Sequence, residues 1–155
     1  MTAIVTLRCC TGSGAGTESA SINGFAFMDI DSATIDPDDN KVTPGTVSYE
    51  KWLRLAIDDA DGQTVSGFWV ERTGDLPEGV TIKLGIAAAG ATPVATASAV
   101  ATATMAAGRR YWFDSAAYDA DNDRTGFLVL QEVVAAGAAS GAIDTQAFEF
   151  GYSAA

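Results

Sequence analysis

The chain has 155 residues, and 20 acidic against nine basic side chains give a formal charge of -11. This length suits a single domain that buries a substantial core without disulfide or metal support. Affinity for nucleic acids and for anionic membranes depends largely on basic side chains, so the charge predicts that the chain binds neither. No stretch is long and apolar enough to predict a membrane-spanning helix.

The first predicted strand covers residues 3–10, which are rich in aliphatic and β-branched side chains. It ends with the adjacent pair Cys9 and Cys10. A disulfide between neighbours is strained and closes no useful loop. Alternation along a strand instead places the two thiols, both reduced, on opposite faces.

A flexible Gly/Ser segment, residues 11–16, follows this strand. We expect residues 1–20 to form an N-terminal strand and arm, and residues 21–155 to form a single β-sandwich domain. The chain begins without the cationic and apolar regions of a signal peptide, which predicts synthesis and folding in a cytoplasm.

A second strand is predicted at residues 21–30, where apolar side chains on both faces indicate a strand that is covered twice. The acidic residues 29–40 that follow are rich in Asp and contain Asn and Pro, which are typical of loops. We expect this segment to run over the surface.

Residues 49–86 contain three runs in which apolar and polar side chains alternate, as in strands with one buried face. The segments between them, residues 58–62 and 73–79, carry the Asp, Gly and Pro that turns need. The pattern predicts an antiparallel β meander.

Residues 87–107 consist mainly of Ala, Thr, Val and Gly. Ala favours a helix, but the β-branched residues and the period of two favour a small-residue strand or an extended strap. Side chains this small let another backbone approach closely, so Thr92, Pro93 and Thr96 are candidate interface residues. The same composition also fits a low-complexity strand without a partner.

Three further strands are predicted at residues 109–113, 127–134 and 147–152. The total of about eight short strands is typical of an antiparallel β-sandwich, of the jelly-roll or Ig-like kind, with long acidic loops.

The sequence contains no histidine, the commonest general base and zinc ligand. Catalysis would then depend on paired carboxylates, as in glycoside hydrolysis. Glu50, Glu71 and Glu132 fit solvent-facing positions of alternating strands instead. We therefore expect no enzyme, no catalytic residue and no cofactor.

Several acidic turns could supply oxygen ligands for calcium. Residues 119–123 begin like an EF-hand loop, but Arg124 stands where Gly is needed and Leu130 where the closing Glu is needed. A nonstandard loop there, at residues 58–61 or at residues 29–36 is the alternative to hydrated acidic turns that keep the protein soluble. The turns are the simpler interpretation, so we expect no metal site.

Three tryptophans invite comparison with a sugar-stacking platform. Trp52 and Trp69 lie inside alternating strands, which favours packing in a core or an interface. Arg109 and Arg110 could bind a phosphate or an acidic neighbour, but beside three aromatic residues they fit better as a polar strand start or as an ion pair across a subunit contact. We take Arg109, Arg110 and Trp112 as further candidate interface residues.

Five short motifs are distinctive: residues 48–53 (SYEKWL), 75–80 (DLPEGV), 91–96 (ATPVAT), 127–131 (FLVLQ) and 148–152 (FEFGY). Together they span roughly residue 49 to the end of the chain. They resemble motifs of small structural proteins encoded by tailed bacteriophages.

The resemblance implies a virion protein, and first of all a capsid decoration or cement protein. Such a protein binds the major capsid protein on the outer shell and stabilises the joints between its subunits. The resemblance also implies a homo-oligomer, such as a trimer, that is made in the host cytoplasm and located on the capsid surface. A glycine-rich arm at residues 12–16 would reach a neighbouring subunit. The alternatives are a neck, tail or fibre component, and a carbohydrate-binding β-sandwich module.

Overall fold

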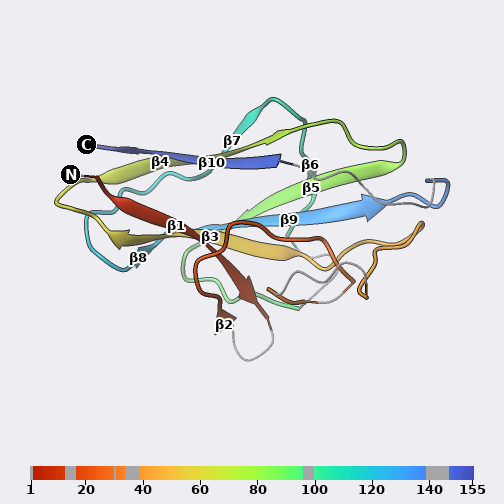
Figure 1. The fold of residues 1–155 in the computed structure, drawn as a ribbon, viewed down its shortest axis with the longest axis horizontal. Coiled ribbons are helices and arrows are strands. Elements are labelled where there is room, and N and C mark those ends of the chain that lie inside the picture. Colours follow the sequence, from red (N-terminus) through yellow and green to blue (C-terminus); the bar gives the residue numbers. More distant parts are fainter. Residues whose placement is uncertain (1, 13–16, 30, 34–38, 96–99, 139–146) are drawn as a thin grey trace.

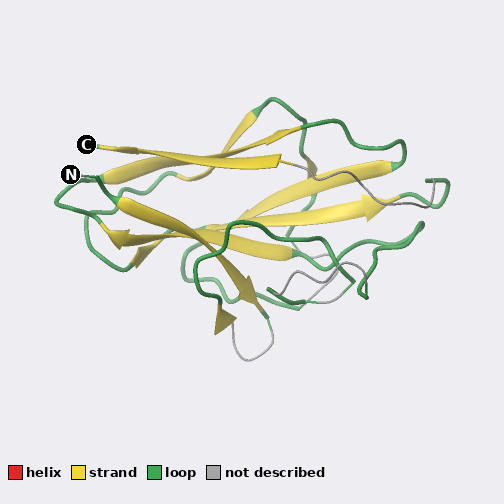
Figure 2. Ribbon diagram, viewed as in Figure 1, coloured by secondary structure: helices red, strands yellow, loops and turns green. Residues whose placement is uncertain are grey.

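A computed structural model describes residues 2–12, 17–29, 31–33, 39–95, 100–138 and 147–155. These residues form strands and loops and no helix (Figure 2), so none of them forms a helix that could cross a membrane. Three of the ten strands have only two residues, and the other seven have five or more. The strands are β1 (Ile4–Thr11), β2 (Thr17–Glu18), β3 (Lys51–Asp59), β4 (Val65–Thr73), β5 (Val80–Ala87), β6 (Ala103–Thr104), β7 (Arg110–Asp114), β8 (Asp123–Arg124), β9 (Phe127–Val134) and β10 (Ala147–Ala154).

Two antiparallel sheets pack face to face (Figure 1). The larger sheet has the order β2-β1-β3-β9-β5-β6, and β8 also pairs with β3. The smaller sheet has the order β10-β4-β7. The predicted all-β sandwich is confirmed.

The strand order differs from that of an Ig constant-type domain in one respect. The long strands divide four to three, which is the count of an Ig constant-type domain. However, β9, the sixth long strand, lies between β3 and β5, where the Ig fold places its fifth strand. The described strands thus have the four-to-three division of an Ig constant-type sandwich with a different strand order.

The predicted meander is wrong, although β3, β4 and β5 form where expected. β4 lies in the smaller sheet, whereas β3 and β5 lie in the larger one. The turn between β3 and β4 has hairpin geometry, because Asp61 and Gly62 both have positive φ (51° and 70°) and the Gln63 N–H donates to the Ala60 carbonyl at 2.9 Å. The chain nevertheless crosses to the other sheet after this turn. Alternation reports which face of a strand is buried, and it does not report which strands pair.

The main core lies between the two sheets. Its buried side chains come from both: Cys9, Leu53, Leu55, Ile57, Ile82, Leu84, Leu128 and Leu130 from the larger sheet, and Val65, Phe68, Val70 and Phe113 from the smaller. Both sheets therefore bury one face of alternating apolar residues in the same interior.

A second apolar cluster covers the outer face of the larger sheet. It contains Cys10, Trp52, Ala101, Phe127 and Val129. β9 is consequently buried on both faces, which explains its nearly continuous apolar sequence. The two cysteines are free and lie in different clusters, so their predicted placement on opposite faces is confirmed.

The described residues 88–95 and 100–102, which we call the strap, lie against this outer face. It contains no helix among its described residues, and only Ala103–Thr104 beyond it form a ladder with β5. Its backbone comes so close to β5 that a Cβ on Gly85 would lie 2.1 Å from the carbonyl oxygen of Val100. The small side chains therefore allow a close contact within the chain itself.

Glu50 fixes the end of the strap. It is fully buried, and its Oε1 accepts hydrogen bonds from the N–H groups of Val100 (2.7 Å) and Ala101 (2.8 Å). The prediction that Glu50 faces solvent is wrong. A carboxylate that satisfies two backbone donors can be buried, because its hydrogen bonds replace those it made with water.

The sequence predicted a second strand at residues 21–30, but residues 21–29, which the structure describes, form no strand. Ile22 makes an isolated bridge with Leu7, and the rest of the segment is irregular. Phe25 and Phe27 pack on Phe148 of β10, with ring centroids 5.1 and 6.3 Å apart. The apolar side chains of this segment are explained by their packing over the core.

The N-terminal residues belong to the sandwich. β1 pairs with β3 from Ile4 to Cys10, and β2 pairs with β1. Residues 13–16 lie outside the described residues, but the strands on either side are folded against their own sheet. This counts against an arm at residues 12–16 that reaches a neighbouring subunit.

Replacing Glu50 with Ala removes the acceptor of two N–H groups. We expect the free energy of unfolding to fall by roughly 2–4 kcal/mol, because these groups are then buried without their partner. Urea unfolding followed by circular dichroism measures the loss. Glu78→Ala, at an exposed position in the loop before β5, is the control and should change stability by less than about 0.5 kcal/mol. Equal losses in the two variants would contradict the role of Glu50.

Candidate functional site

The three glutamates considered for acid catalysis lie in three separate places in the fold. Glu50 points to the strap on the outer face of the larger sheet. Leu128, Leu130 and Glu132 are spaced two residues apart on β9 and therefore share one face. Because both leucines lie in the main core, Glu132 faces the interior between the sheets. Glu71 pairs with Arg110 on the outer face of the smaller sheet. No two of these carboxyls form the facing pair that glycoside hydrolysis needs.

Glu132 is 7% exposed, which corrects its predicted solvent-facing position. Its backbone N–H donates to the Ser48 hydroxyl at 3.0 Å. No hydrogen bond or ion pair to its carboxyl is found among the described residues. Burial raises the pKa of this carboxyl to about 7.

Ionisation of Glu132 should therefore weaken the fold. Because the folded pKa lies above the ordinary value, this contribution to stability is complete below about pH 4.5 and is lost as the pH rises to about 7. We expect Glu132→Gln to be more stable than the parent at about pH 8, by on the order of 2 kcal/mol, and the difference to shrink near pH 4. Urea unfolding at several pH values measures this. A difference that does not depend on pH would contradict it.

Several carboxylates of the acidic turns accept hydrogen bonds from backbone N–H groups of the same chain. Asp121 accepts a hydrogen bond from the Ala60 N–H (2.9 Å), and Asp59 accepts one from the Asp61 N–H (2.8 Å). Asp31 likewise accepts from the Gly12 N–H at 2.6 Å. Within the part of the chain that the structure describes, no three His, Cys, Asp or Glu side chains gather as metal ligands would. Residues 34–36 of one suggested calcium loop lie outside that part.

Most basic side chains are also engaged inside the chain. Arg8 binds Asp58, Arg54 and Arg124 both bind Glu18, Arg72 donates to the Gly74 carbonyl, and Lys51 donates to the Ser32 carbonyl. Lys51 is buried, and this burial lowers its pKa. These contacts join strands or hold loops, so they serve the fold.

The surface, in contrast, carries an exposed group of side chains formed by Arg109, Arg110 and Trp112. The Arg110 guanidinium lies 3.9 Å from the centroid of Trp69, and its Nε is 3.5 Å from Glu71. Arg109 lies 5.2 Å from the centroid of Tyr111. Trp112 is 60% exposed. The sequence predicted these three interface candidates, and the structure brings them together.

They line a groove, which we call the β7 groove, at the open side between the two sheets. Its volume is about 690 Å³. The lining residues are Leu84, Ile86, Gly108, Arg109, Arg110, Tyr111 and Trp112. Sequence reasoning missed Ile86, because its alternation with buried Leu84 predicts a core position. It is 53% exposed and lies beside the open groove.

The outer face of the smaller sheet continues from this groove. In its ladder, Trp69 is opposite Trp112 on one side and Gly151 on the other. The Trp69 indole lies directly over Gly151, where a Cβ would be 2.1 Å from the ring. Trp112, Arg110 and Glu149 on this face are exposed. The face thus differs from the outer face of the larger sheet, which the strap covers.

The other predicted interface residues that the structure describes, Thr92 and Pro93, do not join this group. Thr92 and Pro93 lie on the strap, where Thr92 is exposed and Pro93 is buried. Thr96 lies outside the described residues. Burial of Pro93 against its own chain corrects the prediction that it is an interface residue.

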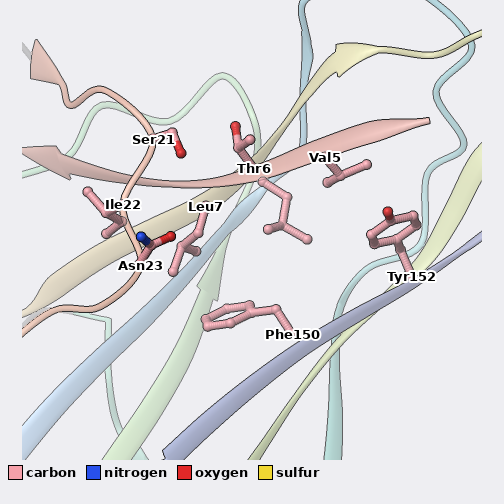
Figure 3. Close-up of a pocket in the computed structure, with 9 residues that line it drawn as sticks. Val5, Thr6, Leu7, Ser21, Ile22, Asn23, Phe150 and Tyr152 are labelled. Atoms are coloured by element: carbon pink, nitrogen blue, oxygen red, sulfur yellow. The ribbon is translucent and has the colours of Figure 1, made fainter. Parts of the chain in front are cut away.

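A smaller cavity of about 270 Å³ lies on the opposite open side of the sandwich. Leu7 of β1 points toward Phe150 of β10, and Val5 and Tyr152 extend the same lining (Figure 3). The remaining lining residues are Thr6, Ser21, Ile22, Asn23 and Leu55. None of the described residues that line it is charged, so it offers no group for proton transfer.

Comparisons with known proteins give no identity: no protein-family model, no curated protein and no solved structure matches the chain.

Gly151→Ala tests how the face is built. The added Cβ collides with the Trp69 indole, so the ring must move and its stacking with Arg110 is lost. We expect a displaced Trp69 indole N–H resonance in an NMR spectrum and a loss of roughly 1–3 kcal/mol in stability. Gly24→Ala is the control, because no atom lies within 4 Å of its Cβ position. An unchanged Trp69 resonance in Gly151→Ala would contradict this packing.

Proposed function

We propose that this chain is a non-catalytic structural protein of a tailed bacteriophage virion, and specifically a capsid decoration protein. It would bind the major capsid protein on the outer shell and stabilise the joints between capsid subunits. The observation that carries the proposal is the exposed face of Trp112, Arg110 and Trp69 on an otherwise well-packed sandwich. The phage-like motifs between residue 48 and the end of the chain supply the biological context.

The composition of the face supports protein binding. Tryptophan and arginine are enriched among the residues that contribute most to protein interfaces. The chain has a charge of -11, which opposes contact with nucleic acid and anionic membranes. A protein partner is the class that this composition suits best.

The chemistry of the chain supports a role without catalysis. The sequence has no histidine, and the three glutamates considered lie in separate places, two of them buried. A decoration protein needs no reacting group. Each copy has to contribute only a few kcal/mol, because the same contact recurs over the shell. The protein would be made in the host cytoplasm and located on the capsid surface as a homo-oligomer, with a trimer as one form.

Quantitative mass spectrometry of purified particles tests this function. A decoration protein should be present in a copy number comparable with that of the major capsid protein, whereas a neck component is limited to one closed ring. Binding of the purified chain to undecorated shells should weaken roughly thirtyfold in Trp112→Ala, because a central tryptophan contributes about 2 kcal/mol or more. Ile4→Ala, at an exposed position on β1, should bind like the parent. Absence from the particles would refute the proposal.

The carbohydrate-binding module is the second candidate. It is favoured by one observation, which is that Trp112 and Tyr111 line an open groove in which a sugar ring could stack. Binding on a glycan array that is lost in Trp112→Ala, together with absence from particles, would support it.

A further inference from the structure

The dipeptide Asn23-Gly24 has a reactivity that does not depend on any other catalytic group. The side chain of an asparagine reaches the backbone nitrogen of the next residue, and a glycine there has no Cβ to obstruct the approach. The chain contains three asparagines, Asn23, Asn40 and Asn122, and Asn23 alone precedes a glycine. Asn23 is therefore the asparagine whose reaction with its own backbone the sequence favours.

We propose that Asn23 is a site of self-modification. Its side-chain amide is converted to a carboxylate, and in part of the molecules the main chain is rerouted through the side chain as isoaspartate. The reactants are the chain itself and water. The inference stands whether or not the virion role is correct.

The reaction has two steps. In the first, hydroxide removes the proton of the Gly24 N–H and the nitrogen attacks Cγ of Asn23. A cyclic succinimide forms through the new N–Cγ bond, while the Cγ–Nδ2 bond breaks and the amide nitrogen takes up a proton and leaves as ammonia. In the second step water opens the ring. Attack at Cγ gives aspartate, and attack at the main-chain carbonyl carbon of residue 23 gives isoaspartate.

The Gly24 nitrogen is free to attack. Among the described residues, its N–H donates no hydrogen bond. An N–H that is bonded to a carbonyl would have to give up that bond before it lost its proton. No atom lies within 4 Å of the position that a Cβ on Gly24 would occupy. The nitrogen is thus held neither by a partner nor by crowding.

Asn23 is equally accessible. It is exposed, and no hydrogen bond to its side-chain amide is found in the part of the chain that the structure describes. Figure 3 shows its side chain next to Ile22 at the smaller cavity, which lies on an open side of the sandwich. Hydroxide and water can therefore reach the reacting atoms in the folded protein.

The other two asparagines are less suited to this reaction. The nitrogen that would attack Asn122 belongs to Asp123, and its N–H donates to the Ala120 carbonyl at 3.4 Å. The Asn122 N–H is itself bonded to the Ile57 carbonyl at 2.7 Å. Asn40 is followed by a lysine, whose Cβ and side chain shield the backbone nitrogen. Both serve as internal references for Asn23.

The modification falls between two points at which the segment is fixed. On one side the Ile22 N–H donates to the Leu7 carbonyl at 2.9 Å, and on the other Phe25 packs on Phe148 with ring centroids 5.1 Å apart. Isoaspartate brings the Cβ of residue 23 into the main chain, so the path between these points becomes longer. It also places a carboxylate beside a cavity that no charged residue lines. The reaction should therefore loosen the cover over this side of the core.

Peptide mass mapping of the folded full chain, incubated at mildly alkaline pH, tests the site. We expect the mass increase of amide-to-acid conversion at residue 23, in two products of equal mass that chromatography separates, with Asn40 and Asn122 unchanged. Gly24→Ala should slow the conversion at least about tenfold, because the methyl group shields the attacking nitrogen and restricts its backbone. This variant should fold like the parent, because Gly24 has no positive φ and its Cβ position is open. Circular dichroism verifies this.

Hydrogen exchange tests the effect on the fold. In the isoaspartate product the Ile22 N–H should exchange at least about tenfold faster than in the parent, because its bond to Leu7 is strained. Asn23→Asp is the matched control, since it adds the same charge without lengthening the main chain. Its Ile22 N–H should exchange like that of the parent.

Three results would overturn the proposal. They are an Asn23 that stays intact in the folded chain, a conversion that is as fast at Asn40 or Asn122 as at Asn23, and a conversion that is equally fast in Gly24→Ala. Equal exchange at Ile22 in the isoaspartate product and in Asn23→Asp would refute the loosening of the cover. All are measured on the isolated chain, so they are distinguishable from a failure to find the protein in particles.

Discussion

The fold depends on the burial of both faces of β9. Leu128 and Leu130 are buried in the main core, whereas Phe127 and Val129 face the opposite direction and need a second cover. The strap supplies that cover, and its small side chains let it lie close to the sheet. Glu50 then satisfies N–H groups of the strap that have no ladder partner. A buried carboxylate in this sandwich is thus a consequence of covering its central strand.

This arrangement makes the two outer faces unequal. The larger sheet is closed by its own chain, and the smaller sheet is left with exposed Trp112 and Arg110. Trp69 is held between Gly151 below and Arg110 above, so the exposed face has a fixed shape before any partner arrives. A preorganised aromatic and arginine surface loses little conformational entropy on binding. That property suits a protein that acts by adhesion.

The sequence by itself determined the β class, the positions of six long strands after residue 50 to within two residues at each end, and the opposite faces of Cys9 and Cys10. It also identified Arg109, Arg110 and Trp112, which are neighbours in the chain and need no long-range contact to lie together. Only the tertiary structure decided that β4 leaves β3 and β5 for the other sheet, that Glu50 and Glu132 are buried, that residues 21–29 cover the core without forming a strand, and that Pro93 packs inside. The reason is that a period of two is a local property, which reports the two faces of one strand. Strand pairing and the covering of a sheet face depend on contacts between residues far apart in the chain. Those contacts are decided only when the apolar side chains of the whole chain are buried together.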